Sequence, residues 1–468
     1  MAMAPVTRSL FSAAVFGLGA IAFLLTAVDH KNIVPYSGLS IALLSIAFLF
    51  SMSAIGWISS GSRIALSMQV MLLYFSVYLI LPGMVHVATG QYPFSSIEYE
   101  RWVTDRSSLI LIIFIFVSLF SYALCGLRSD SSRPSLVVGS LTVQPRTWFQ
   151  VCMVALSLFA MIVYVMTLGV GQLFSLRGDI RIAPLVGASG TGLFVNLPRV
   201  FTVVVFVYCF SVVRYSNRSF ISMLLLLLSA IPIIVTMWPL SVPRSSFFGF
   251  MLFLSAVAFS FHGHASRVLL SGLYIVGAFV AMPVLDGLTR ARSGIGSIDL
   301  SSLYAKYFQS GDFDGLQSIN NAVVYVGEHG VANGIQLLSA VLFFVPRSLW
   351  LGKAQPTGTV AADFAGYGFT NVSMPLPSEF YFDFGFLGVI IGGAAVGCVL
   401  FKLDGYFTAK WAGSVKARML AGAVIGYTIA IYRGTLIGVV PPISLLVLIL
   451  LIIMRFGFIV DRVELSRS

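Results

Sequence analysis

The sequence has very little charge for its length. Only 10% of its 468 residues are Asp, Glu, Lys or Arg, whereas 58% are hydrophobic and the mean hydropathy is +0.96. Soluble globular chains carry about 25% charged residues, so water cannot be the main solvent of this one. The apolar residues recur in runs of roughly 20, the length of a helix that spans a bilayer. We therefore expect an all-α integral membrane protein.

Cysteine and histidine are scarce too, which limits the kinds of metal, disulfide or catalytic site that the chain can form. The four cysteines fall in or beside apolar runs without CxxC or Cys/His spacing, so we expect neither a disulfide nor a bound metal. No GxSxG, Walker-type, HExxH or dinucleotide-binding motif occurs in a suitable context, which argues against a nucleotide or other cofactor. The sequence also lacks a soluble basic domain, so its net charge of +11 does not indicate nucleic-acid binding.

Twelve apolar runs can be placed as membrane spans. They are 9–28, 36–57, 64–88, 107–127, 148–170, 197–213, 220–240, 246–262, 267–284, 380–401, 419–436 and 438–454. With both termini inside, the inner connections hold fifteen basic and four acidic residues, and the outer connections hold thirteen of each. This distribution satisfies the positive-inside rule. We expect one polytopic domain over 1–468 with both termini in the cytoplasm.

One long connection, 285–379, is a predicted extracytoplasmic loop. It contains an apolar stretch, 334–350, which is barely long enough to span. Counting that stretch as a span would place the basic segment 402–418 outside and the termini on opposite sides. We therefore predict that 334–350 is a helix on the membrane surface or a re-entrant helix.

Arginine recurs on the predicted outer side, where positive charge is normally sparse. Across the chain arginine outnumbers lysine 22 to 6, and guanidinium groups bind phosphate oxygens in pairs. Singly, such residues often reach lipid phosphates or pair with loop carboxylates. Taken together, we interpret them as an anion site. The set comprises Arg177, Arg181, Arg244, Arg290, Arg292, Arg347 and Arg433, with Lys353 and Trp350 beside Arg347, although Trp350 alone suits an interfacial anchor.

Two carboxylates begin the span 380–401. Glu379 and Asp383 are four residues apart and so share one helical face. The glycines that follow them suit either helix packing or a lipid groove. A carboxylate at this depth must be either paired or used as a general base, so Glu379 is our first candidate for a catalytic base, with Asp383 and then His329 as alternatives. Glu379 could equally pair with an outer arginine.

These segments resemble a known family. The stretches VPRSLWLGKAQPTG and SEFYFDFGFLG are similar to the signature of the Wzy family of O-antigen and exopolysaccharide polymerases. The resemblance is strongest over 335–393. It extends more weakly to LRGDI at 176–180, PRSS at 243–246 and YRG at 432–434.

The resemblance implies a GT-C-like membrane glycosyltransferase that needs no metal. Such an enzyme polymerises undecaprenyl-pyrophosphate-linked oligosaccharide repeat units on the periplasmic face of the bacterial inner membrane. Its partners would be the lipid-linked donor and acceptor, the lipid bilayer and a chain-length regulator protein. A ligase with a different glycan acceptor uses similar parts, and a flippase of lipid-linked sugars would also need arginines. A flippase favours internal repeats and charges near mid-membrane, neither of which is clear here.

Overall fold

Helices make up almost all of the described chain. The computed structural model describes residues 38–61, 63–94, 98–127, 140–175, 192–216, 219–259, 261, 264–284, 307–411 and 413–464. Among these residues, nine helices are long and apolar enough to cross a membrane. The chain is therefore a multi-pass membrane protein. The first predicted span, 9–28, lies outside the described residues.

The nine candidate spans fall on nine of the predicted apolar runs. They are α2 (Gly38–Ser60), α3 (Leu66–Tyr74) with η2 (Phe75–Ile80) and α4 (Leu81–Thr89), α5 (Arg101–Leu127), α6 (Thr147–Leu168), η5 (Gly192–Asn196) with α8 (Leu197–Tyr215), α11 (His264–Val276) with η6 (Gly277–Ala281), α17 (Leu376–Lys410), α18 (Val415–Arg433) and α19 (Leu436–Phe456).

Two further predicted runs form shorter helices. They are α9 (Phe220–Thr236), with 17 residues, and α10 (Arg244–Ala258), with 15. Both fall below the roughly 20 residues that cross a bilayer without adjustment. The structure thus supports the placement of helices in these runs but gives nine candidate spans in the part of the chain that it describes.

The helices enclose two hydrophobic cores that meet at α10 and α18. One core is built from α2 to α5, α11, α14 (Gly315–His329) and α17, and the other from α6, α8, α9 and α19, while α10 and α18 contribute to both. These two helices approach closely at Gly249 and Gly426, where an added Cβ on either would overlap the carbonyl oxygen of the other. The close crossing brings Arg244 of α10 and Arg433 of α18 to the same end of the bundle.

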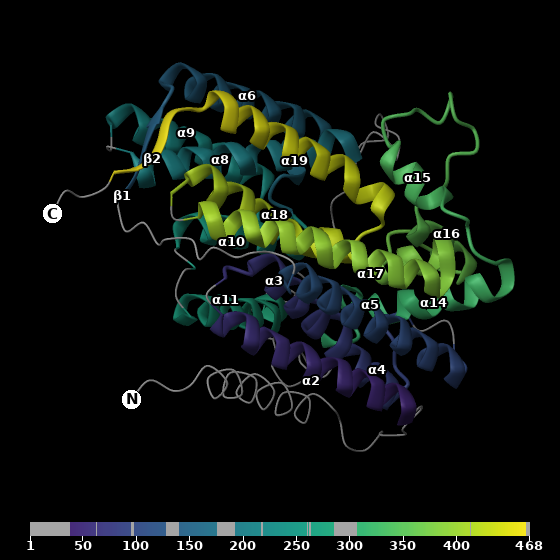
Figure 1. Cartoon of the computed structure of the whole chain (residues 1–468). Helices are drawn as coiled ribbons and strands as arrows, with labels where there is room; N and C mark the ends of the chain where they lie inside the picture. The colour runs from purple at the N-terminus through teal and green to yellow at the C-terminus, as the bar shows by residue number, and fades with distance from the viewer. Residues whose placement is uncertain are drawn as a thin grey trace, which may run out of the picture.

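The two ends of the bundle carry different structures (Figure 1). At one end, β1 (Ser140–Pro145) pairs antiparallel with β2 (Phe458–Glu464), a small sheet that the sequence analysis did not predict. At the other end lie α14 (Gly315–His329), α15 (Ile335–Val341) and α16 (Thr357–Phe364). The described part of the predicted loop 285–379 is therefore largely helical and covers one end of the bundle.

The helix expected over 334–350 is shorter in the structure. α15 has seven residues and ends at Val341, and turns follow as far as Gly352. Large side chains at the tip of this segment are exposed, with Leu349 at 81% and Leu351 at 92%. Such exposed apolar residues are compatible with the predicted contact with the membrane surface.

α17 is a broken helix. It starts after Pro375 and is interrupted at Gly385, where φ is +62° and ψ is −148°, a conformation that favours glycine strongly. Beyond the break, Gly393 and Gly397 face the backbone of α5, where an added Cβ would crowd the carbonyl oxygens of Phe114 and Ser118. Of the two roles considered for the glycines after Asp383, the contacts of Gly393 are those of helix packing.

Candidate anion-binding cavity

A cavity of about 520 Å³ lies where the two cores meet. Its walls come from α8, α10, α18 and the beginning of α19, together with the loops before α5, α14 and α17. Apolar residues such as Val203, Phe250 and Ile443 form part of its lining. Its charged lining residues, among those described, are Arg199, Arg244, Asp312 and Arg433.

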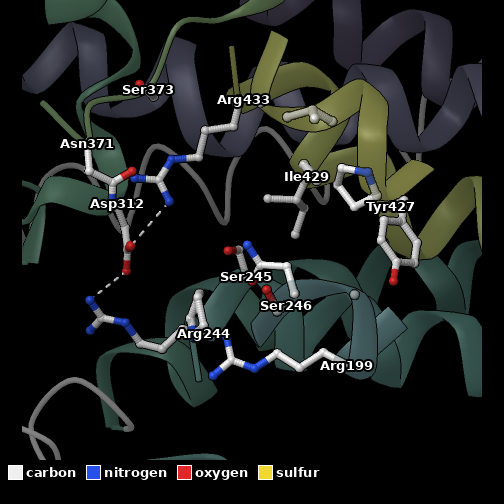
Figure 2. A pocket seen from close by; sticks show the side chains of 18 of the residues that line it. Arg199, Arg244, Ser245, Ser246, Asp312, Asn371, Ser373, Tyr427, Ile429 and Arg433 are labelled. Carbon is white, nitrogen blue, oxygen red and sulfur yellow. Dashed lines mark hydrogen bonds and ion pairs between the residues drawn. The ribbon is translucent and has the colours of Figure 1, made fainter. Parts of the chain in front are cut away.

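Arg244 and Arg433 meet at one carboxylate. The Arg244 Nη2 atom lies 2.8 Å from Oδ2 of Asp312, and the Arg433 Nη1 atom lies 3.4 Å from Oδ1 of the same residue. The two guanidinium groups reach Asp312 from opposite sides (Figure 2). Arg244 occupies the first position of α10 and Arg433 the last position of α18, so the glycine crossing of these helices sets their separation.

Further hydrogen bonds and an ion pair, beyond those to Asp312, hold Arg433 in place. Its Nη2 atom donates to the Gly311 carbonyl at 2.5 Å and lies 3.4 Å from Oδ1 of Asp314. Asp314 is buried and also accepts bonds from the backbone N–H and the hydroxyl of Ser373. The Arg433 carbonyl accepts the N–H of Met374 at 2.8 Å. The orientation of Arg433 is therefore fixed from both its backbone and its side chain.

A third guanidinium, that of Arg199, lines the same cavity. Arg199 lies in the first turn of α8, and its Nη2 atom donates to the Tyr164 hydroxyl at 2.9 Å. The guanidinium also lies 5.3 Å from the centre of the Tyr164 ring, a distance that suits a cation–π contact. The buried Arg199 Nε atom has no hydrogen-bond partner in the described chain.

Among the described residues, positive charge exceeds negative charge at this cavity. Three arginines line it, whereas Asp312 is the one acidic residue among the described lining residues. Asp314 pairs with Arg433 from outside the lining, and counting it still leaves more positive than negative charge. Charges that are largely removed from water need partners. An anion with several oxygens, such as a phosphate or pyrophosphate, would balance this positive charge and accept hydrogen bonds from guanidinium groups.

Arg347 and Lys353 bond instead within their own loop. The two Nη atoms of Arg347 donate to the carbonyls of Lys353 and Ala354, each at 2.8 Å. Lys353 Nζ donates to the carbonyls of Phe343 and Val345 just beyond α15, again at 2.8 Å. Desolvation and the nearby Arg347 charge lower the pKa of Lys353. Neither residue lines the cavity, and nor does Trp350, which follows Leu349 at the exposed turn.

The other predicted arginines cannot be placed. Arg177, Arg181, Arg290 and Arg292 lie outside the described residues. Of the nine residues predicted to bind substrate, the structure thus brings Arg244 and Arg433 into one cavity and sets Arg347, Lys353 and Trp350 apart from it.

Glu379 is buried behind the cavity wall. It is 1% exposed, and its Oε1 atom accepts the Thr357 hydroxyl and the backbone N–H of Leu436, the latter at 3.0 Å. These bonds join the starts of α16, α17 and α19. Glu379 does not line the cavity, and within the described residues no ion pair joins it to an arginine. Its role as the base stays a prediction.

The two alternative bases also have local partners. Asp383 accepts the N–H groups of Gln336 and Leu337 at 3.2 and 2.8 Å, and so caps the start of α15. His329 is exposed at the end of α14 and stacks on Tyr325, with the ring centres 4.6 Å apart. Neither lines the cavity. Among the described residues, no group of three or more His, Cys, Asp or Glu side chains could hold a metal ion.

Sequence reasoning did not single out Arg199, Asp312 or Asp314. Arg199 stands in the first turn of an apolar run, on the predicted outer side, a position that it shares with Arg244. The segment GDFDG contains both aspartates, but it lies in a long loop without a periodic pattern. The position of Arg199 was a usable signal, whereas nothing local marked the aspartates as partners of the arginines.

Comparison of the chain with protein-family models, curated proteins and solved structures finds no match.

Proposed function

We propose that this chain is a membrane glycosyltransferase that polymerises undecaprenyl-pyrophosphate-linked oligosaccharide repeat units. The observation that supports this proposal most directly is the meeting of Arg199, Arg244 and Arg433 in one cavity. A cavity with excess positive charge at one end of a helical bundle suits a substrate whose pyrophosphate lies at the membrane surface and whose lipid lies in the bilayer. The cavity faces the periplasm or cell exterior in this proposal.

In the proposed reaction, the acceptor sugar hydroxyl oxygen attacks the anomeric carbon of the donor. The bond between that carbon and the pyrophosphate oxygen breaks, and undecaprenyl pyrophosphate leaves with the bonding electrons. The hydroxyl proton passes to a base. The arginines stabilise the charge that develops on the leaving pyrophosphate, which is the contribution that fixed donors make to a transition state.

Asp312 is our first candidate for the base, because a base must lie within hydrogen-bond reach of the attacking hydroxyl. It is the carboxylate that lines the cavity within the described ranges, and its side chain is 14% exposed. Glu379 remains the alternative, since it accepts the N–H of Leu436, which lies between Gly434 and Gly438 of the cavity lining.

The experiment replaces Arg244 and Arg433 by lysine, which keeps the charge and removes the planar fork. Loss of a charge-assisted hydrogen bond costs about 1.5–3 kcal/mol, so we expect polymer yield to fall at least about tenfold. Lipid-linked single units would then accumulate at normal protein level. Arg347→Lys is the matched control, because Arg347 bonds to loop carbonyls outside the cavity. Normal polymer from both cavity variants would contradict the proposal.

A flippase of lipid-linked oligosaccharides is the second candidate, and the break at Gly385 favours it. Discontinuous helices often line the substrate sites of transporters. Here, however, the break follows the Asp383 cap and the bond from Ala332 N–H to the Phe382 carbonyl, which together hold α15. Loss of the gene separates the candidates. A cell without its polymerase still displays single repeat units, a cell without its flippase displays none, and a cell without its ligase keeps polymer on the lipid carrier.

A further inference from the structure

A cluster of three aromatic side chains borders the cavity beside the arginines. The Phe94 and Phe369 rings pack edge to face with their centres 4.9 Å apart, and Tyr367 stacks on Phe369 at 5.5 Å. Phe94 and Phe369 line the cavity, as does Asn371. Phe369 is 44% exposed, although it contacts both of the other rings. The charged substrate groups proposed above do not account for this exposed aromatic surface.

The cluster is held by a buried polar network. The side-chain amide of Gln317 bonds to both backbone groups of Phe94, accepting its N–H at 2.9 Å and donating to its carbonyl at 2.5 Å. The Tyr367 hydroxyl accepts bonds from Gln317 Nε2 at 3.0 Å and Asn321 Nδ2 at 3.1 Å. Gln317 and Asn321 are buried in α14. The backbone of Phe94 and the ring of Tyr367, against which Phe369 packs, are thus held in place before any ligand arrives, which lowers the entropy cost of binding.

Gly311 lies between the aromatic cluster and the arginine site and contacts both. A Cβ added to Gly311 would lie 3.3 Å from the tip of the Phe94 ring, and the Gly311 carbonyl accepts Arg433 Nη2. Asp312, which bridges the two arginines, follows directly in the chain. A group bound by Arg244 and Arg433 would therefore have the Phe94 ring near it, on the other side of Gly311.

We infer that Phe94 and Phe369 form a platform for the sugar ring that is attached to the pyrophosphate. The C–H face of a hexose or N-acetylhexosamine is apolar and packs on an aromatic ring, while its hydroxyl groups need polar partners. Asn371, which lines the cavity two residues after Phe369, supplies an amide for such a hydroxyl. This inference rests on the proposed function, because it takes the arginines as the pyrophosphate site.

The test compares two ligands of the purified protein in lipid nanodiscs. One is undecaprenyl pyrophosphate without sugar, and the other is undecaprenyl-pyrophosphate-linked N-acetylglucosamine. We expect wild type to bind the sugar-bearing lipid about three- to tenfold more tightly, the range expected of an aromatic stacking contact. Phe94→Leu and Phe369→Leu keep an apolar side chain but remove the flat face. Each is expected to lose this preference and to retain its affinity for the lipid without sugar.

Two controls separate this inference from the proposed function. Arg433→Lys is expected to weaken binding of both lipids, whereas Phe344→Leu, at a 67% exposed position away from the cavity, is expected to change neither. Binding of neither lipid by wild type would refute the pyrophosphate site and the platform together. Equal binding of both lipids by wild type, or a sugar preference that survives in both leucine variants, would refute the platform alone.

Discussion

The Arg244 guanidinium and the Asp312 carboxylate form an ion pair of 2.8 Å that ties the first residue of α10 to the loop before α14. Their side chains are 11% and 14% exposed, so water screens the pair only in part. Arg433 shares the same carboxylate from α18. Asp312 therefore holds two cations close together and, at the same time, occupies part of the space in which a phosphate would meet them.

The first prediction concerns this double role. Asp312→Asn keeps the shape and removes the negative charge, so the two guanidinium groups repel each other in the empty cavity and attract an anion more strongly. A charge 5 Å away contributes about 3 kcal/mol at an effective dielectric constant of 20. We expect the variant to unfold at a lower temperature and to bind inorganic pyrophosphate at least about tenfold more tightly, as measured by calorimetry in detergent.

Pyrophosphate is expected to restore the unfolding temperature of Asp312→Asn, because a ligand stabilises the state that binds it. Asp363→Asn is the control, since Asp363 is exposed on α16 and does not line the cavity. Unchanged or weaker pyrophosphate binding by Asp312→Asn would argue against an anion site between the two arginines.

The second prediction distinguishes the two candidate bases. In Glu379→Gln, the amide oxygen can still accept the Thr357 hydroxyl and the Leu436 N–H, so the wall of the cavity is kept. We expect this variant to make polymer, whereas Asp312→Asn makes none and accumulates lipid-linked single units. Gel analysis of polymer length and quantification of the lipid-linked units measure both outcomes. Loss of polymer in Glu379→Gln alone, at normal protein level, would assign the base to Glu379.

The sequence predicted the helices well because a span needs about 20 consecutive apolar residues, which are visible without any tertiary information. It also predicted that Arg244 and Arg433 belong together, because both stand at helix ends on one predicted side. It also assigned Arg347 and Lys353 to the same anion site, whereas the structure places both residues outside the cavity lining. The hydrogen-bond partners of these two residues are backbone carbonyl groups six to eleven residues away along the chain. Composition alone does not show whether a loop folds back on itself in this way.

The carboxylates were harder to predict than the arginines. Glu379 and Asp383 share a helix face, as expected, yet each accepts a hydrogen bond from a backbone N–H of a neighbouring element. Asp312 became the partner of two arginines that are distant in sequence, through a contact that depends on how α10 and α18 cross. The break in α17 could not be predicted either, because nothing in the sequence distinguishes Gly385 from Gly388 or Gly392.

The third prediction concerns this break. Gly385 has a positive φ that an L side chain rarely adopts, so Gly385→Ala is expected to lower the free energy of unfolding by about 1–3 kcal/mol. Gly272→Ala is the matched control, since Gly272 lies in α11 with no atom within 4 Å of an added Cβ. Alanine is expected to be neutral or slightly stabilising there. Equal thermal stability of the two variants in detergent would contradict the strained break.

The last prediction concerns the side of the membrane that the cavity faces. Gln309 is exposed and precedes Gly311 of the cavity by two residues, so a cysteine at 309 reports the side of the cavity itself. Ser310, only 4% exposed, would react poorly. Ala409 is exposed near the end of α17, beside Lys410, in a segment that the positive-inside rule places in the cytoplasm.

In a background with Cys125, Cys152, Cys209 and Cys398 replaced by alanine, we expect a membrane-impermeant maleimide to label Gln309→Cys in intact spheroplasts. Ala409→Cys is expected to react only after permeabilisation. The reason is the charge distribution, with basic residues in excess on one predicted side and balanced by acids on the other. The reverse pattern would place Arg244 and Arg433 on the cytoplasmic side. A donor carried on undecaprenyl pyrophosphate at the outer face could not then reach them, and the polymerase proposal would fail with the topology.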